Sequence, residues 1–390
     1  MKRTILNAIA GAAIFFTATA LYPCSYFTAN PAGTLCVQQK DAREYEVKPG
    51  GTLNISLTGG GDIEIKGWDK NLFSSDSKSD GSADIKYSKE GNDIKVTSLG
   101  GSDIKITVFV PKKFNVVFTT SNGDVNIEQI EGSIKGATMA GDLYLNGING
   151  KLSLTTMGGD ITLKNSKAEG KVNTKGGNVL VENVEGNVDA SSNGGSVKQI
   201  NVTQTAKGKG KTSSAGKETN ISSLGGDLII DEAANGAKLA TLGGDISVNH
   251  AGKFLSASTN GGDITAKSVD GWITAKTLGG DIDVTMTGNP NDGKRDVTLN
   301  SLGGDITLKV PKGLSMNIDI EIAYTKDNKV KKFEDYKVES NIQLQQERTG
   351  EWDNSQGTPR KFIYAKANVN GGKNTIKIRT INGNVYLKQQ

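Results

Sequence analysis

A short group of residues, Gly-Gly-Asp followed by an apolar residue, recurs along this 390-residue chain and constrains its fold more than any other feature. Its third position falls every eighteen residues from 124 to 196, and again from 227 to 281. A fixed period of this kind is the signature of a repeat architecture, in which similar units stack on one another. The residues at this position are Asp124, Asp142, Asp160, Asn178, Ser196, Asp227, Asp245, Asp263, Asp281 and Asp305.

Within each repeat, apolar residues alternate with polar ones on both sides of a glycine turn. In the repeat of Asp142, the inward set comprises Leu143 and Leu145, and then Leu152 and Leu154. A period of two indicates half-buried strands, and no helical periodicity is visible. A single repeat has nothing to bury its apolar rows against, so stacking must supply the core. The sequence therefore predicts an all-β parallel β-solenoid (β-helix) built of two-strand coils of about 18 residues.

The repeat is irregular at both ends and is interrupted within. Residues 43–118 alternate with period two but lack a fixed spacing, so we expect an N-terminal β-rich cap before the coils of residues 119–310. A longer step inside the coils places a basic loop at 203–219. We expect residues 311–390 to form a C-terminal β cap, because an open stack end would expose unpaired strand edges.

The N-terminus has the pattern of an export signal. Lys2 and Arg3 precede an apolar stretch, and small residues at 18–20 offer a cleavage site. We expect residues 1–20 to be a signal peptide and residues 21–42 to be irregular, with no membrane-spanning segment after cleavage. An uncleaved anchor is the alternative, although the apolar stretch is barely long enough to span a bilayer.

The chain has two cysteines, Cys24 and Cys36. In an exported protein this pair favours a local disulfide bond. Lipidation of Cys24 is a further alternative. Tyr22 and Pro23, which directly precede it, match a lipoprotein signal poorly. The only histidine, His250, is far away in the sequence, so we expect neither a catalytic nor a metal-binding role for these thiols.

The recurring aspartates are the sharpest candidate site. Stacked carboxylates about 5 Å apart repel one another unless hydrogen bonds or a cation offset the repulsion. Asn178 and Ser196 occupy the same position in two repeats, which favours side chains that cap turn amides over charged ligands. Calcium held between turns is the alternative. We expect a structural turn ladder, with no metal and no cofactor.

The basic loop offers a second candidate. Its lysines would be available for anionic glycans or acidic partners, with a solvated linker as the alternative. The net charge of +4 and an aromatic content of 6% argue against nucleic-acid binding. The candidate anion contacts are Lys207, Lys209, Lys211 and Lys217.

Three stretches of the chain carry a resemblance to a known family. They are residues 61–69, the segment from 110 to 125, and the serial Gly-Gly-Asp-Ile copies. Over residues 44–390 the chain resembles a family of exported bacterial β-strand-repeat proteins called "putative adhesin", whose domain has no established function. The resemblance implies a β-solenoid at the cell envelope or surface and suggests adhesion, and it offers no catalytic residues to carry over.

We therefore expect a non-enzymatic, exported β-solenoid scaffold at the bacterial cell surface or outer envelope, with the periplasm as an alternative location. Adhesion or matrix contact would involve surface glycans or matrix proteins. The competing hypothesis is a carbohydrate-active β-helix, either a polysaccharide lyase or a hydrolase. Every candidate carboxylate is a repeat copy, and we find no repeat with its own cluster of acidic, basic and aromatic residues, which favours the scaffold. The sequence does not indicate the oligomeric state.

Overall fold

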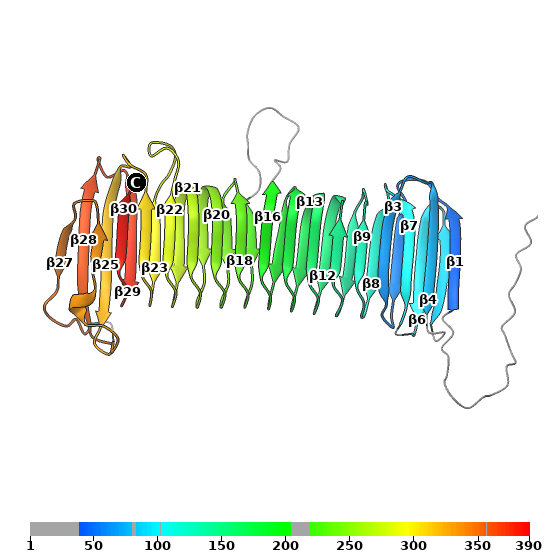
Figure 1. Cartoon of the computed structure of the whole chain (residues 1–390), viewed down its shortest axis with the longest axis horizontal. Coiled ribbons are helices and arrows are strands. Elements are labelled where there is room, and N and C mark those ends of the chain that lie inside the picture. The colour runs from blue at the N-terminus through cyan, green and yellow to red at the C-terminus, as the bar shows by residue number, and fades with distance from the viewer. Residues whose placement is uncertain (1–38, 80–82, 102, 204–217, 356) are drawn as a thin grey trace, which may run out of the picture. The chain divides into compact units, whose positions relative to one another are not determined.

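The computed structural model describes residues 39–79, 83–101, 103–203, 218–355 and 357–390. Apart from one short 3-10 helix, η1 (Phe333–Asp335), every element in these ranges is a β-strand (Figure 1). The predicted all-β class is thereby confirmed. Within the described ranges, no helix has the length and apolar character needed to cross a membrane.

Two long parallel ladders make up the central part of the fold, and the chain alternates between them. We call them ladder A and ladder B. Ladder A consists of β8 (Asn115–Thr120), β10 (Ile134–Thr138), β12 (Asn149–Thr156), the second part of β13 (Ile161–Thr174), β15 (Val188–Ser192), β17 (Thr219–Ser222), β19 (Ala237–Ala240), the second parts of β20 (Ile246–Ser258) and β21 (Ile264–Thr277), and β23 (Val297–Ser301). Ladder B consists of β9 (Val125–Glu128), β11 (Leu143–Asn146), the first part of β13, β14 (Val179–Glu185), β16 (Val197–Thr203), β18 (Leu228–Ala233), the first parts of β20 and β21, β22 (Ile282–Met286) and β24 (Ile306–Val310).

The register of both ladders follows the sequence period. In the regular coils, paired residues lie eighteen positions apart, as Ile134 pairs with Leu152 in ladder A and Leu143 with Ile161 in ladder B. Side chains alternate between inside and outside, because successive residues of a strand point to opposite faces. The inward residues of both ladders form one apolar cluster, with many side chains fully buried. Each coil thus buries its apolar rows on the next coil.

The coils extend further toward the N-terminus than the sequence indicated. β2 (Thr52–Leu57) pairs in parallel with β8, and β3 (Asp62–Trp68) pairs in parallel with β9. The expected cap at 43–118 therefore contains a true coil. The sequence period does not reveal this coil, because 46 residues that form β4 to β7 separate β3 from β8.

The remaining N-terminal strands close this end of the stack. β6 (Asp93–Leu99) pairs with β2 and β7 (Lys105–Pro111) pairs with β3, both in parallel. Three antiparallel strands then cover the outer edges, namely β5 (Asp84–Glu90) on β6, β4 (Leu72–Ser79) on β7 and β1 (Gln39–Glu46) on β4. Residues 39–42, expected to be irregular, belong to β1, because its polar sequence obtains backbone partners from β4.

The C-terminal end repeats this arrangement. The last two strands, β29 (Asn374–Ile381) and β30 (Val385–Gln389), insert as a coil beside β23 and β24. The earlier strands β25 (Met316–Thr325) and β26 (Val338–Ser340) lie on the far side of that coil. β28 (Arg360–Val369) and β27 (Gln345–Arg348) complete the edge in antiparallel pairing. The expected cap at 311–390 thus also contains coil strands, out of sequence order.

Candidate functional site

The turns that join ladder A to ladder B lie along one edge of the stack, and each turn is held by a buried hydroxyl. Thr156 is fully buried; its Oγ1 donates to the carbonyl of Gly141 at 3.0 Å and accepts from the amide of Gly159 at 3.2 Å. The same pair of bonds recurs at Thr174, Thr259 and Thr277. The hydroxyl thus ties each turn both to itself and to the preceding coil.

The two glycines of each turn have different roles. A Cβ on Gly159 would lie 2.1 Å from the carbonyl oxygen of Gly141 in the coil below, so only glycine fits there. A Cβ on Gly158 would meet nothing closer than 3.5 Å. This explains why Ala140 and Asn122 occur at the first position in other repeats, whereas the second position is always glycine.

The side chains of the recurring acidic row also bind the next coil. The Oδ1 atom of Asp142 accepts a hydrogen bond from the backbone amide of Asp160 at 2.7 Å, although both residues are exposed. Asn178 accepts through its amide oxygen and Ser196 through its hydroxyl, in the same direction. The common property of the row is therefore one oxygen acceptor per coil. The equivalent bonds begin at Asp124, Asp160, Asp227, Asp245, Asp263 and Asp281.

This row is longer than the sequence period indicated. Asp62 accepts from the amide of Asp124 at 3.0 Å, across 62 residues of sequence. At the other end, Asp305 accepts from the amide of Asn384 at 2.7 Å, across 79 residues. Both positions carry visible copies of the motif, at Gly60-Gly61-Asp62 and Asn382-Gly383-Asn384. Their place in the row could not be read from the sequence, because long insertions separate them from their neighbours.

A second row on the same edge was not predicted. Three positions before the aspartate, large apolar side chains of several coils point into solvent, with exposed fractions between 44% and 56%. Two small residues separate this row from the acidic one. Its members are Met139, Met157, Leu224, Leu242, Leu278 and Leu302, whereas Ser121, Lys175, Asn193 and Asn260 hold the same position in other coils. Most of the large exposed apolar side chains in the described ranges belong to this one row, which makes the turn edge chemically distinct.

The opposite corner of several coils carries an asparagine row. Asn165, Asn183 and Asn201 adopt positive φ angles between 48° and 55°, a conformation that asparagine tolerates well. Their side chains join in series, with Asn183 donating to Asn165 at 3.2 Å and Asn201 donating to Asn183 at 2.8 Å. His250 continues this side of the stack, where its Nδ1 lies 2.7 Å from the carboxylate of Glu232 in the neighbouring coil. These contacts all run from coil to coil.

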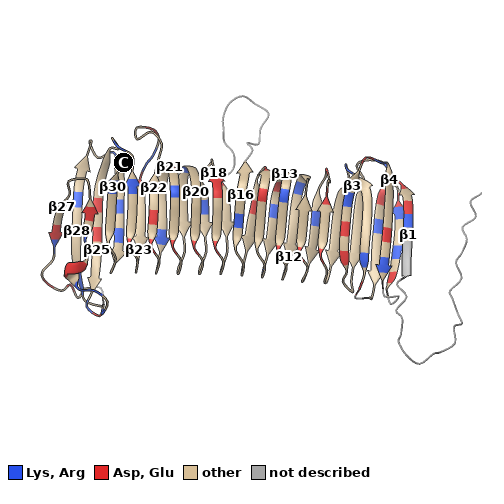
Figure 2. Ribbon diagram, in the orientation of Figure 1, with Lys and Arg blue, Asp and Glu red and all other residues tan. Residues whose placement is uncertain are grey.

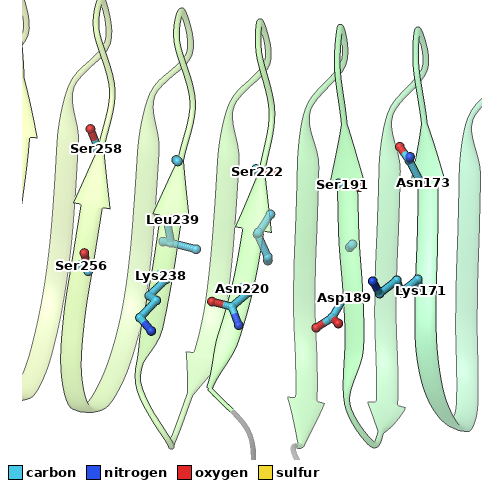
Figure 3. A pocket seen from close by; sticks show the side chains of 13 residues that line it. Lys171, Asn173, Asp189, Ser191, Asn220, Ser222, Lys238, Leu239, Ser256 and Ser258 are labelled. Carbon is cyan, nitrogen blue, oxygen red and sulfur yellow. The ribbon is translucent and has the colours of Figure 1, made fainter.

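The outer surface of ladder A contains a groove with a volume of about 640 Å³ (Figure 3). It lies where β15 and β17 pair at only two positions, Ala190 with Ile221 and Ser191 with Ser222. Short polar side chains and two lysines line it, together with the apolar residues Ala190, Ile221, Leu239 and Ala240. The residues include Lys171, Asn173, Asp189, Asn220, Lys238 and Ser256. The groove therefore offers hydrogen-bond donors and acceptors on several coils, which a polyhydroxylated ligand could use.

The charges on this groove are only partly compensated. Lys238 is paired with Glu218 at 2.7 Å, whereas Lys171 makes no ion pair with any residue that the structure describes. On ladder B, by contrast, outward charges pair between coils. Lys164 lies 2.9 Å from Glu182, and this hydrogen bond raises the pKa of Lys164 above its ordinary value. Figure 2 shows the charged positions of successive strands.

Several predicted sites cannot be placed. Lys207, Lys209, Lys211 and Lys217 lie outside the described residues, as do Cys24 and Cys36. In the part of the chain that the structure does describe, no group of three or more His, Cys, Asp and Glu side chains is arranged to hold a metal ion.

Comparison with known proteins places part of the chain in a family context. Residues 46–215 match the model of the family described as Toastrack DUF4097. The match covers less than half of the chain. Over these residues the protein is similar to that family. It supports the expected resemblance to a family of unknown function over this range, and it does not extend to the later Gly-Gly-Asp-Ile copies. No curated protein matches the chain.

Solved structures described as adhesion or lipid-binding proteins match the chain with low sequence identity and low TM-scores. A "putative cell adhesion protein" from Clostridium sporogenes has 11% identity and a TM-score of 0.18, covering 91% of this chain and 100% of that one. A "putative adhesin" from Bacteroides fragilis has 14% identity and a TM-score of 0.19, covering 92% and 100%. A "putative lipid binding protein" from Parabacteroides distasonis has 11% identity and a TM-score of 0.24, covering 89% and 96%. These values are too low to support an argument about function.

Proposed function

We propose that this protein is a non-enzymatic, exported scaffold of the bacterial envelope or cell surface, whose stacked coils present contact sites for surface glycans or matrix proteins. The observation that carries the proposal is the use of the repeated carboxylates. Each one accepts the amide of the next coil, so the residues most prominent in the sequence serve stacking.

The same observation argues against the carbohydrate-active alternative. A glycosidase needs two carboxyl groups in different environments, one as the acid and the other as base or nucleophile. The acidic row places like groups in like environments, each with the same amide donor from the neighbouring coil. Such a row supplies no pair with divided roles.

The groove on ladder A is the contact site that we propose for glycans. Its lining combines hydroxyl, amide and ammonium groups over five successive coils, and the free Lys171 ammonium adds a charge-assisted donor. A linear polysaccharide lying along the stack would meet these groups in turn.

Binding and hydrolysis can be separated in one experiment. The purified protein is incubated with a panel of envelope and matrix polysaccharides, and both retention and new reducing ends are measured. We expect retention without new reducing ends, and weaker retention for Lys171→Ala combined with Asn220→Ala. Lys198→Ala, which removes an outward lysine of ladder B, is the matched control. Reproducible release of reducing ends would overturn the non-enzymatic proposal.

Location requires its own measurement. Protease treatment of intact cells should degrade the protein if it is exposed at the cell surface. Complete protection in intact cells, with degradation only after the outer layer is opened, would place it in the periplasm and remove adhesion from the proposal.

A further inference from the structure

The last turn of the stack differs from all the others. Between β25 and β26 the short glycine turn is replaced by the segment Lys326–Tyr336. The acidic row also ends here. Asp305 accepts the amide of Asn384 at 2.7 Å, and Asn384 in turn accepts the amide of Lys337 at 3.1 Å. The row position thus holds a carboxylate, an amide and a lysine in three successive coils, and the ammonium of Lys337 is paired with Glu339 at 2.9 Å.

The inserted segment holds an apolar side chain away from the protein. Val330 is 86% exposed, more than any other large apolar residue in the described ranges. Its amide donates to Oδ1 of Asn328 at 2.8 Å, and Nδ2 of Asn328 donates to the buried hydroxyl of Tyr336 at 2.7 Å. Val330 is therefore presented by an ordered turn with side-chain anchors, and its exposure is built into the loop.

Lysines flank this exposed side chain in the sequence. Lys326, Lys329, Lys331 and Lys332 lie within seven residues, with Asp327 as the only acid among them. None of these four lysines forms an ion pair with a described residue. Two further acids follow in η1: Glu334 is exposed, and Asp335 accepts the amide of Lys332 at 3.0 Å.

Aromatic rings orient part of this charge. The ammonium groups of Lys326 and Lys361 lie 5.9 Å and 5.0 Å from the ring centre of Trp352, which is half-buried. Lys331 lies 5.8 Å from the ring centre of Tyr336. Cation–π contacts of this kind hold the lysine stems on the protein and leave the ammonium groups near the surface.

We infer that the loop Lys326–Lys332 docks on a membrane surface rich in anionic lipid headgroups. Lysines near such a surface contribute additively through its negative potential, and an exposed apolar residue between them can enter the boundary between headgroups and acyl chains. The half-buried Trp352 is of the residue type enriched at that boundary. Val330 favours a lipid surface over a soluble polyanion, because a polyanion offers no apolar layer for it. This inference is independent of the proposed glycan contact on ladder A.

The test uses the purified full-length protein and sedimentation with vesicles of phosphatidylcholine, with or without phosphatidylglycerol. We expect binding only to the anionic vesicles, weakened by added salt because surface charge is screened. Lys329→Gln with Lys331→Gln should weaken it by about twenty- to thirty-fold, at about five-fold per lysine. Val330→Ser should weaken it by about ten-fold through lost apolar insertion. Neither variant should alter folding, since Val330 is 86% exposed and the cation–π contact of Lys331 with Tyr336 contributes only a small stabilisation at an exposed site.

Matched controls remove the same groups elsewhere. Lys198→Gln with Lys276→Gln neutralises two exposed lysines of the coils, and Leu278→Ser removes an exposed apolar side chain of the turn row. Both controls should bind like the wild type. Equal binding to both kinds of vesicle, no binding, or equal weakening by controls and loop variants would overturn the inference. Binding that depends on the lysines but is unchanged in Val330→Ser would also overturn it, and would indicate a soluble polyanion as the partner.

Discussion

At the scale of single residues, this fold depends on what each position must do for the coil next to it. Gly159 leaves room for a neighbouring carbonyl, Thr156 bridges two turns, and Asp160 supplies an acceptor for the following coil. These demands repeat with the coil, so the residue types repeat too. Asn and Ser can replace Asp because any short side chain with an oxygen acceptor meets the same demand.

The two glycines of a turn give a sharp test of this interpretation. Gly159→Ala should destabilise the protein by about 1–3 kcal/mol or more, because the new Cβ would overlap a backbone carbonyl that cannot rotate away. Gly158→Ala, one residue earlier, should stay within about 1 kcal/mol of the wild type. Urea unfolding measures both changes. Equal destabilisation by the two variants would contradict the assigned close approach.

The acidic row allows a test of turn capping against calcium binding. Asp160→Ala should cost about 0.5–1.5 kcal/mol, because the amide of Asn178 loses its acceptor. Asp160→Asn keeps the oxygen and should be close to the wild type. Thermal unfolding with and without a chelator supplies the second readout. A melting temperature lowered by several degrees on chelation would favour calcium held between the turns.

One carboxylate predicts a pH dependence. Lys66 donates to Glu64 at 2.6 Å and Thr107 donates at 3.2 Å; the Lys66 bond is the main reason that the pKa of Glu64 is lowered, against the opposing effect of burial. Because the folded-state pKa lies below the unfolded one, this stabilisation is present above the unfolded pKa and disappears as pH falls through the folded value. Glu64→Gln should therefore reduce stability at pH 7 by less than about 1 kcal/mol, since the pair is partly solvated. The difference should shrink as pH falls through the folded-state pKa of Glu64 and be absent well below it, and its persistence there would contradict this assignment.

At the scale of elements, the turn edge combines a structural row and an exposed row. The acidic side chains are engaged between coils, whereas the Leu and Met row three positions earlier remains half in solvent. Lys175, Asn193 and Asn260 hold this position in the intervening coils, so the row consists of short apolar segments rather than one continuous patch. The spacing that buries apolar residues inside the coils also aligns these side chains outside them.

The exposed row should contribute little to stability. Leu242→Ser together with Leu278→Ser should change the free energy of unfolding by less than about 1 kcal/mol, because both side chains are 52% exposed. The same variant should lower binding of a dye that reports apolar surface. Leu239→Ser, on the inward side of β19 and 2% exposed, is the contrasting variant and should destabilise strongly. A large loss of stability in the first variant would show that the row packs internally.

At the scale of the whole described unit, both ends are closed by strands that are out of sequence order. β29 lies between β23 and β25, and β30 lies between β24 and β26. The chain therefore completes its C-terminal core with its last residues. Antiparallel strands then take up the outermost backbone groups, which limits unpaired edges.

Removing the last coil should consequently affect the entire end. A variant ending at residue 372 lacks β29 and β30, so β26 would lose its strand partner and β23, β24 and β25 would each lose one of two partners. We expect aggregation on size-exclusion chromatography and increased dye binding. Deletion of Gln390 alone is the control, since it removes one exposed residue and two backbone hydrogen bonds, to Val310 and Lys312, while leaving β29 and most of β30 in place. A monomeric, dye-free truncated protein would contradict the role assigned to this coil.

The sequence by itself determined the strands, the coil and the residues of the turns, because these follow from contacts between equivalent positions at a constant spacing. Asp142 and Asp160 could be placed in one row from their numbers alone. Tertiary structure decided what lies beyond that spacing. Asp62 joins the row beside Asp124, and Asn384 joins it beside Asp305, through pairings across long insertions that no local pattern encodes. Tertiary structure also decided which apolar side chains are exposed. Val330 and the Leu and Met row are of the same residue types as the core, but the turns that carry them direct their side chains into solvent.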